Sequence, residues 1–145
     1  MPRVVVSNQR TPGRVRELMS LGIRAHDIQA EARLVLERHG VPSEALVLLP
    51  EPVDFTEAEL RLVGLAAQAR GWRRVILVTS PQHSRCVKLV WQRGAGLGIE
   101  GLVVLAQEED FLVDGWWLKR RQAEAVLHEY LGLAAIYLNI SRFLN

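Results

Sequence analysis

One segment of the chain gathers a hydroxyl, an imidazole and two cations directly after a hydrophobic run. The run Val75–Thr79 is rich in β-branched residues and turns at once into SPQHSRCVK. Ser80 followed by Pro81 predicts a helix N-terminus, where free backbone N–H groups and the positive end of the helix dipole favour an anion. His83 adds a group that titrates near neutral pH. We therefore expect His83 to act as an acid or base beside an anion held by Ser80 and by helix amides.

The site residues expected from this segment are Thr79, Ser80, Gln82, His83 and Arg85. The alternative is structural: Ser80 caps the helix, His83 is an ordinary polar residue, and Arg85 and Lys88 are solvated. The position beyond a strand end favours a functional role for Ser80 and His83. Solvation is the favoured interpretation for the two cations.

Cys86 follows His83 by about one helical turn, a spacing that allows a thiol–imidazole pair. The thiol shares its helix face with Leu89 and Val90, and free Cys is among the most often buried residue types. We therefore expect Cys86 to pack in the core rather than to act as a nucleophile. The four His residues have no metal-ligand spacing with this single Cys, so the sequence predicts no metal site.

Four short apolar runs predict the strands that position these residues. They are Val4–Val6, Ala45–Leu49, Val75–Thr79 and Leu102–Leu105, each apolar on both faces, as in a parallel sheet covered by helices. Stretches of helical period separate them, which predicts right-handed crossovers. The expected fold is α/β, a three-layer α/β/α sandwich with a mostly parallel, Rossmann-like sheet, and residues 1–145 form one domain.

The helices are delimited by clear start and stop signals. Arg24–His39 is followed by a glycine and a proline, and the spacing of Thr56 and Glu59 is that of a capping box for a helix ending at Gly71. A long final helix is expected over 115–145. Its segment Leu131–Ile140 is apolar almost all round and should be buried against the sheet, the alternatives being a homodimer seam or contact with a membrane surface.

Ligands of open parallel sheets bind beyond the carboxyl ends of the strands. This rule selects the segments Ser7–Thr11, Pro50–Glu59, Thr79–Lys88 and Gln107–Asp114. Ser7 and Asn8 are therefore further candidates for ligand binding.

Three motifs, in this order and spacing, resemble the YdcF-like family, the SanA/ElyC group, a bacterial domain of unknown function. VILVTSPQHSRCV is similar to the family's strand and turn, and HGVPSEALVLLPEPVDFTEAEL to its GVP turn, next strand and Thr-containing turn. GWWLKRRQAEAVLHEYLGL resembles the Trp-Trp and Glu-Tyr-Leu ending of one branch. The resemblance covers residues 4 to 137.

The resemblance implies a strand-end pocket lined by Glu31, Thr56, Glu59, Thr79, Ser80 and His83. Glu31 lies at the edge of an apolar stripe, an expensive place for a carboxylate without a partner, which favours a functional role. Thr56 and Glu59 are explained by the capping box, so capping is the favoured interpretation there. The candidate catalytic residues are His83, Glu31 and Glu59. The candidate ligand-binding residues are Ser7, Asn8, Thr56, Thr79, Ser80, Gln82 and Arg85.

The chain departs from the family pattern in three places. Cys86 replaces an Arg, and Ser7-Asn8-Gln9 replaces Ser-Gly-Gly, and both changes weaken an anion site. The family also has a strand, a glycine-rich turn and a helix ahead of the strand matched by Val4–Val6. Loss of that inner strand would leave two unpaired edges and an apolar groove. We therefore expect an N-terminally truncated form, or else a sheet that closes up or is completed by a second chain.

Composition argues against several classes of function. The 145 residues are 49% hydrophobic and 23% charged, as in an ordinary globular domain, and the net charge of +2 gives no reason to expect nucleic acid as a partner. No apolar run approaches the roughly 20 residues of a membrane span. A cytoplasmic location is expected for the chain as written, or membrane association if an N-terminal segment is missing.

The resemblance implies a link to bacterial cell-envelope maintenance. The first hypothesis is a domain that binds a phosphorylated or nucleotide-like small molecule, with enzymatic activity left open and no cofactor assigned. The alternatives are a non-catalytic or regulatory module for a ligand of the S-adenosylmethionine type, and an adaptor that acts through its C-terminal helix.

Overall fold

The computed structural model describes residues 2–10, 12–23, 27–107, 111 and 114–138. Its strands are β1 (Val4–Gln9), β2 (Leu46–Val53), β3 (Arg74–Thr79) and β4 (Glu100–Leu105). Its helices are α1 (Gly13–Ser20), α2 (Ile28–Arg38), α3 (Thr56–Ala69), α4 (Ser84–Val90) and α5 (Arg120–Tyr137). Short 3-10 turns are η1 (Ser43–Ala45) and η3 (Trp116–Leu118), and the π-helical turn η2 (Trp91–Ala95) continues α4.

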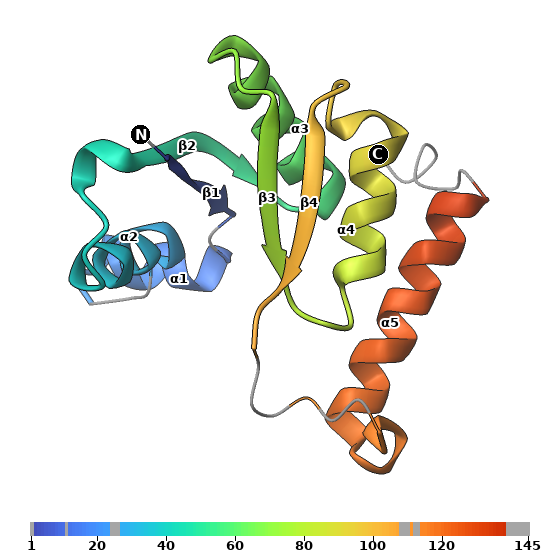
Figure 1. Ribbon diagram of the computed structural model, residues 1–145. Coiled ribbons are helices and arrows are strands. Elements are labelled where there is room, and N and C mark those ends of the chain that lie inside the picture. Colours follow the sequence, from blue (N-terminus) through green and yellow to red (C-terminus); the bar gives the residue numbers. More distant parts are fainter. Residues whose placement is uncertain (1, 11, 24–26, 108–110, 112–113, 139–145) are drawn as a thin grey trace.

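The α/β class and the parallel strand pairs expected from the sequence are confirmed (Figure 1). Each of the four apolar runs forms a strand, except that Ala45 of the second run belongs to η1. Helix α1 was not expected, and α5 begins at Arg120, later than the predicted start near Gly115, because η3 precedes it.

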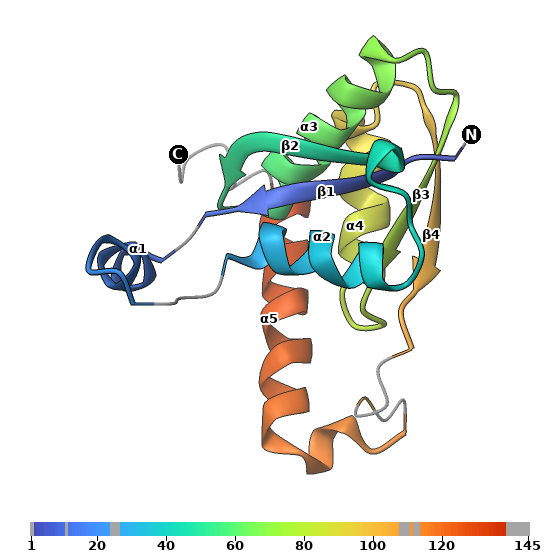
Figure 2. The same cartoon turned by 90° about the vertical axis from the view of Figure 1, so that its left-hand side faces the viewer.

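The strands do not form the single sheet that the sequence predicts. Within the described residues, β1 pairs only with β2, and β3 pairs only with β4, both in parallel. Figure 2 shows the β1–β2 pair crossing the molecule at a steep angle to the β3–β4 pair. No described strand lies between β1 and β3 to link the two pairs.

The core lies where α3, β3, α4 and η2 meet. Its buried cluster is Leu49, Leu60, Val63, Ala66, Leu77, Cys86, Val87, Val90, Trp91, Ala95 and Leu133. Gly64 of α3 allows the closest approach, because a Cβ at this position would lie 2.0 Å from the Ala95 carbonyl oxygen. The Trp91 indole donates to the Ile99 carbonyl at 2.9 Å. The expected burial of Cys86 is confirmed.

Helix α2 is less buried than its pattern predicts. Asp27 is its N-cap and accepts hydrogen bonds from the backbone N–H groups of Gln29 and Ala30. None of its residues is buried, and Ile28 and Val35 of the predicted inner stripe are half-exposed. The helix packs against β1, and the apolar side chains turned away from that contact stay in solvent.

The apolar end of α5 is also not buried as expected. In the described part of Leu131–Ile140, Leu133 is buried, whereas Leu131 and Leu138 are 70% and 69% exposed. The reason is that α5 lies alongside α4 and packs through one face (Figure 1). Its outer face carries an exposed apolar stripe of Leu127, Tyr130, Leu131, Tyr137 and Leu138.

Within the described residues, no helix combines the length and the apolarity that a membrane crossing requires.

Candidate functional site

A groove of about 910 Å³ opens between the two strand pairs, lined by residues of β1, α3 and β3 and by the turn after β3. Five of the expected site residues line it: Ser7, Thr56, Glu59, Thr79 and His83. The carboxyl ends of β1 and β3 supply Ser7 and Thr79, while α3 supplies two side chains from its first turn. The strand-end rule therefore located one end of this groove correctly.

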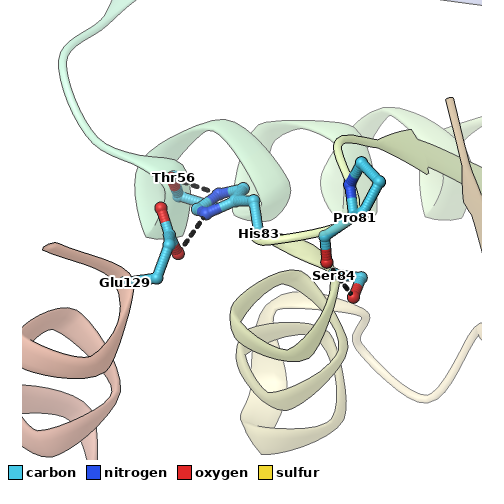
Figure 3. Close-up of polar contacts among 5 residues, drawn as sticks. All are labelled: Thr56, Pro81, His83, Ser84 and Glu129. Carbon is cyan, nitrogen blue, oxygen red and sulfur yellow. Dashed lines mark hydrogen bonds and ion pairs between the residues drawn. The ribbon is translucent and has the colours of Figure 1, made fainter. Parts of the chain in front are cut away.

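His83 is the centre of a hydrogen-bonded series at this end of the groove. Its Nδ1 lies 2.5 Å from Oε2 of Glu129 on α5, and its Nε2 lies 3.2 Å from Oγ1 of Thr56 on α3. Figure 3 shows the imidazole held between the two side chains. The imidazole and the Glu129 carboxylate are 26% and 18% exposed, so both are partly shielded from solvent while a ligand can still reach them. Three separate elements thus fix the orientation of one imidazole.

This arrangement has the order of an activated hydroxyl, a base and an orienting carboxylate. When Nδ1 carries the ring proton, it donates to Glu129, and Nε2 accepts from the Thr56 hydroxyl. The carboxylate then holds the ring in place and stabilises the imidazolium that forms when Nε2 takes a proton. The geometry therefore suits His83 to acid–base chemistry on a hydroxyl group.

A second polar pair joins β1 to α3. The Ser7 hydroxyl donates to Oε1 of Glu59, three residues along α3 from Thr56. The capping box predicted for Thr56 and Glu59 is wrong, because Phe55 is the N-cap and no side chain caps the helix. Thr56 and Glu59 instead contact His83 and Ser7, which favours the functional interpretation of both residues.

The helix expected to begin at Ser80 begins at Ser84. Residues 81–83 form a turn, in which the His83 N–H donates to the Ser80 carbonyl at 3.1 Å. The Ser84 hydroxyl donates to the Pro81 carbonyl at 2.8 Å (Figure 3). The His83 amide thus already has a backbone partner, which weakens the anion site that was expected at the amides of Gln82 and His83.

Five expected site residues lie outside the groove: Glu31, Asn8, Ser80, Gln82 and Arg85. Glu31 is exposed on α2, contrary to the expected pocket position, and Arg85 is exposed on α4. The amide of Asn8 donates to the Pro50 carbonyl at 2.9 Å and so tethers β1 to β2. The segment Gln107–Asp114 lies mostly outside the described residues.

Sequence reasoning missed Glu129 as the partner of His83. The two residues are 46 positions apart, and the contact depends on how α5 packs against α4. The available signal was a carboxylate within an apolar helix, which is costly to bury unless it has a partner.

His83, Cys86 and Glu129 form a cluster whose ligand atoms lie within 4.8 Å of one another. Imidazole, thiolate and carboxylate are the ligands that zinc takes. However, burial raises the pKa of the Cys86 thiol, and the nearby Glu129 carboxylate raises it further. The thiol therefore stays protonated at neutral pH, and a metal would also have to displace the hydrogen bond between His83 and Glu129.

The charge around the groove is divided between its two ends. Glu129 contacts His83, and Glu59 adds a second carboxylate on the first turn of α3, whereas the arginines that line the groove lie where its strands begin: Arg3, Arg73 and Arg74.

Comparison with known proteins found no matching family model, no significantly similar curated protein and no significantly similar solved structure. The geometry of the site therefore carries the functional argument.

Proposed function

We propose that this chain is a ligand-binding domain in which His83 acts as a general acid or base toward a hydroxyl group of a small polar ligand. Glu129 is the positioning residue, and the Thr56 hydroxyl occupies the place that a ligand hydroxyl takes at Nε2. The observation that supports this proposal is the hydrogen-bonded series from Thr56 through His83 to Glu129.

The surrounding charge narrows the class of ligand. The carboxylates of Glu59 and Glu129 repel an anion beside His83 and favour a neutral group that carries hydroxyls. The resemblance to the YdcF-like family suggests phosphorylated or nucleotide-like molecules of cell-envelope metabolism. We propose that a ligand of this kind places a sugar, which carries the hydroxyls, at His83 and its phosphate away from the two carboxylates.

Turnover of nucleotide sugars and lipid-linked sugars by the purified protein tests the proposal, with His83→Gln and Glu129→Gln as variants. A positioned acid or base contributes about 10²–10⁴-fold to rate, so His83→Gln should lose most of the activity. The matched control is His128→Gln, which changes an exposed imidazole of α5. Equal turnover by folded His83→Gln protein would rule out the acid–base role.

A second candidate is a non-catalytic module that binds a ligand of the S-adenosylmethionine type. It is favoured by the same two carboxylates, because they attract a sulfonium cation. Titration calorimetry with S-adenosylmethionine and with its neutral thioether, S-adenosylhomocysteine, separates this function from the first. Tighter binding of the sulfonium form that is lost in Glu59→Gln, without any turnover of sugar substrates, would select this second function.

A further inference from the structure

The middle of the groove is apolar and takes no part in the proposed function. Its lining there comes from Val4 and Val5 of β1, Leu60 and Val63 of α3, and Ile76 and Val78 of β3. Ile76 and Val78 are 59% and 68% exposed, although Leu77 between them is buried in the core. Apolar residues of this kind, gathered along one groove, indicate a surface that another molecule covers.

The walls of the groove are strand edges. On the side of β3 that faces β4, the carbonyls of Arg73 and Thr79 accept from Glu100 and Ala106. Because backbone groups alternate between the two edges of a strand, those of Arg74, Ile76 and Val78 point to the opposite edge, where the groove lies. Within the described residues, no backbone hydrogen bond joins β1 to β3.

The two edges run in the same direction. Ser7 near the end of β1 and His83 just after β3 both contact the first turn of α3, through Glu59 and Thr56. Both strands therefore lead to the same end of the groove. A strand placed between them, running in the same direction and turned from each neighbour by the ordinary twist of a sheet, would find hydrogen-bonding groups on each side.

We propose that the groove binds an extended apolar peptide strand of a partner polypeptide, which runs in the same direction as β1 and β3 and joins the two pairs into one twisted sheet. The regular backbone donors and acceptors of the walls require a backbone as their partner, which a lipid or a small apolar molecule lacks. The bound strand would face α3 on one side and lie level with the exposed Ile76 and Val78 on the other. It should therefore carry apolar, β-branched residues on both faces, like a central strand of a parallel sheet.

Synthetic peptides that copy this protein's own strands are the probes, RVVVSN (residues 3–8) and RVILVT (residues 74–79). Amide hydrogen exchange of the whole protein is measured with and without millimolar peptide. The exchange of the Ile76 and Val78 amides should slow about tenfold or more, and the unfolding temperature should rise with peptide concentration, because the peptide binds the folded state. Peptides with N-methyl groups at alternate residues are the matched controls, since they keep the side chains and lose backbone donors.

Two variants locate the effect. Val78→Pro removes a donor on the groove edge while leaving the β4 side of the ladder intact, and it should weaken binding about tenfold or more. Val104→Lys, on the exposed face of β4, should not. Peptide binding is measured by amide exchange and not by turnover, so a failure here is distinguishable from a failure of the proposed function.

The proposal is overturned if neither peptide slows exchange at Ile76 and Val78, or if the N-methylated peptides act equally well. Protection of these amides that grows with protein concentration alone, together with dimers in light scattering, would instead assign the groove to a second copy of the chain.

Discussion

The half of the molecule built on β3–β4 and the half built on β1–β2 use the same order of strand and helix but differ in how they are held together. The first contains almost all of the core cluster, including Trp91 and Leu77. In the second, the described residues up to Val53 include three buried hydrophobic side chains, Ala45, Leu49 and Val53, and α2 has none. Instead the Gln29 amide of α2 donates to the carbonyls of Val6 and Leu49, at 3.0 and 2.9 Å. A strand–helix–strand pattern therefore predicts elements, and the neighbouring elements decide how deeply these are buried.

The largest expected effect is the loss of Trp91 from the better-packed half. Trp91→Ala removes a buried indole and should lower the free energy of unfolding by about 3–5 kcal/mol. Val35→Ala on the half-exposed face of α2 should change it by about 0.5 kcal/mol or less. Urea denaturation measures both. Similar losses for the two variants would remove the contrast between the halves.

A glycine pair sharpens the comparison by separating close packing from helix propensity. Gly64→Ala places a Cβ against the Ala95 carbonyl and should destabilise the fold by about 1–3 kcal/mol. In Gly132→Ala, on α5, the new Cβ meets no atom within 4 Å. This substitution should stabilise the fold by about 0.5–1 kcal/mol. Thermal unfolding should show shifts of opposite sign. Stabilisation by both substitutions would mean that α3 and η2 are not in close contact.

Cys86 is buried in the core and lies close to His83 and Glu129, so its substitution tests how apolar its surroundings are. Cys86→Ser puts a hydroxyl among buried apolar side chains and should cost about 1–2 kcal/mol, whereas Cys86→Ala should cost less because it leaves no polar group without a partner. Denaturant unfolding at neutral pH measures the difference. Rapid labelling of the native thiol by a neutral reagent would show that Cys86 is more accessible than the structure has it.

The raised pKa of Cys86 also predicts a pH dependence. The thiol ionises first in the unfolded chain, near its ordinary pKa of 9.0, because burial and Glu129 raise the pKa in the folded state. This contribution to stability is therefore complete below that pH and is lost as the pH rises through the folded-state pKa. Above about pH 9, the parent protein should lose stability more steeply than Cys86→Ala. Parallel pH profiles for the two proteins would contradict the shift.

The smallest effect on stability is expected in the half built on β1–β2, and it should be local. Gln29→Ala leaves two backbone carbonyls without their side-chain donor and should cost about 1 kcal/mol. Amide exchange should speed up in α2, while the amides of α3 and β3 keep their protection. Gln68→Ala, at an exposed position of α3, is the matched control. Equal acceleration in both halves would show that they open as one unit.

Local patterns predicted much of the fold. The four strands were recognised because each contains a short apolar run, and the carboxyl ends of β1 and β3 were expected to carry the site because parallel strands direct ligands there. Ser7, Thr79 and His83 do lie at one end of the groove, as this rule leads one to expect. The side chains of Thr56 and Glu59 were misassigned because a capping box is a local motif, whereas their partners lie in distant elements.

Long-range packing accounts for the features that sequence reasoning did not foresee. Glu129 reaches His83 through the docking of α5 beside α4, which no local pattern specifies. The gap between β1 and β3 depends on which edges meet, and apolar runs do not encode edge pairing directly. The exposed stripe of α5 likewise shows that an apolar helix surface predicts a contact without naming the partner.

Because Trp91 is buried, intrinsic tryptophan fluorescence can follow the unfolding of this protein. All four Trp residues occur after residue 71, so intrinsic fluorescence reports mainly on the β3–β4 half, and it senses β1 only through Trp72, which lines the groove together with Val4 and Val5. Trp91 is the buried one of the four, and its emission should shift to longer wavelength once water reaches the indole. Circular dichroism registers the helices of both halves. A difference between the two unfolding curves would therefore reveal, without any label, that one half melts before the other.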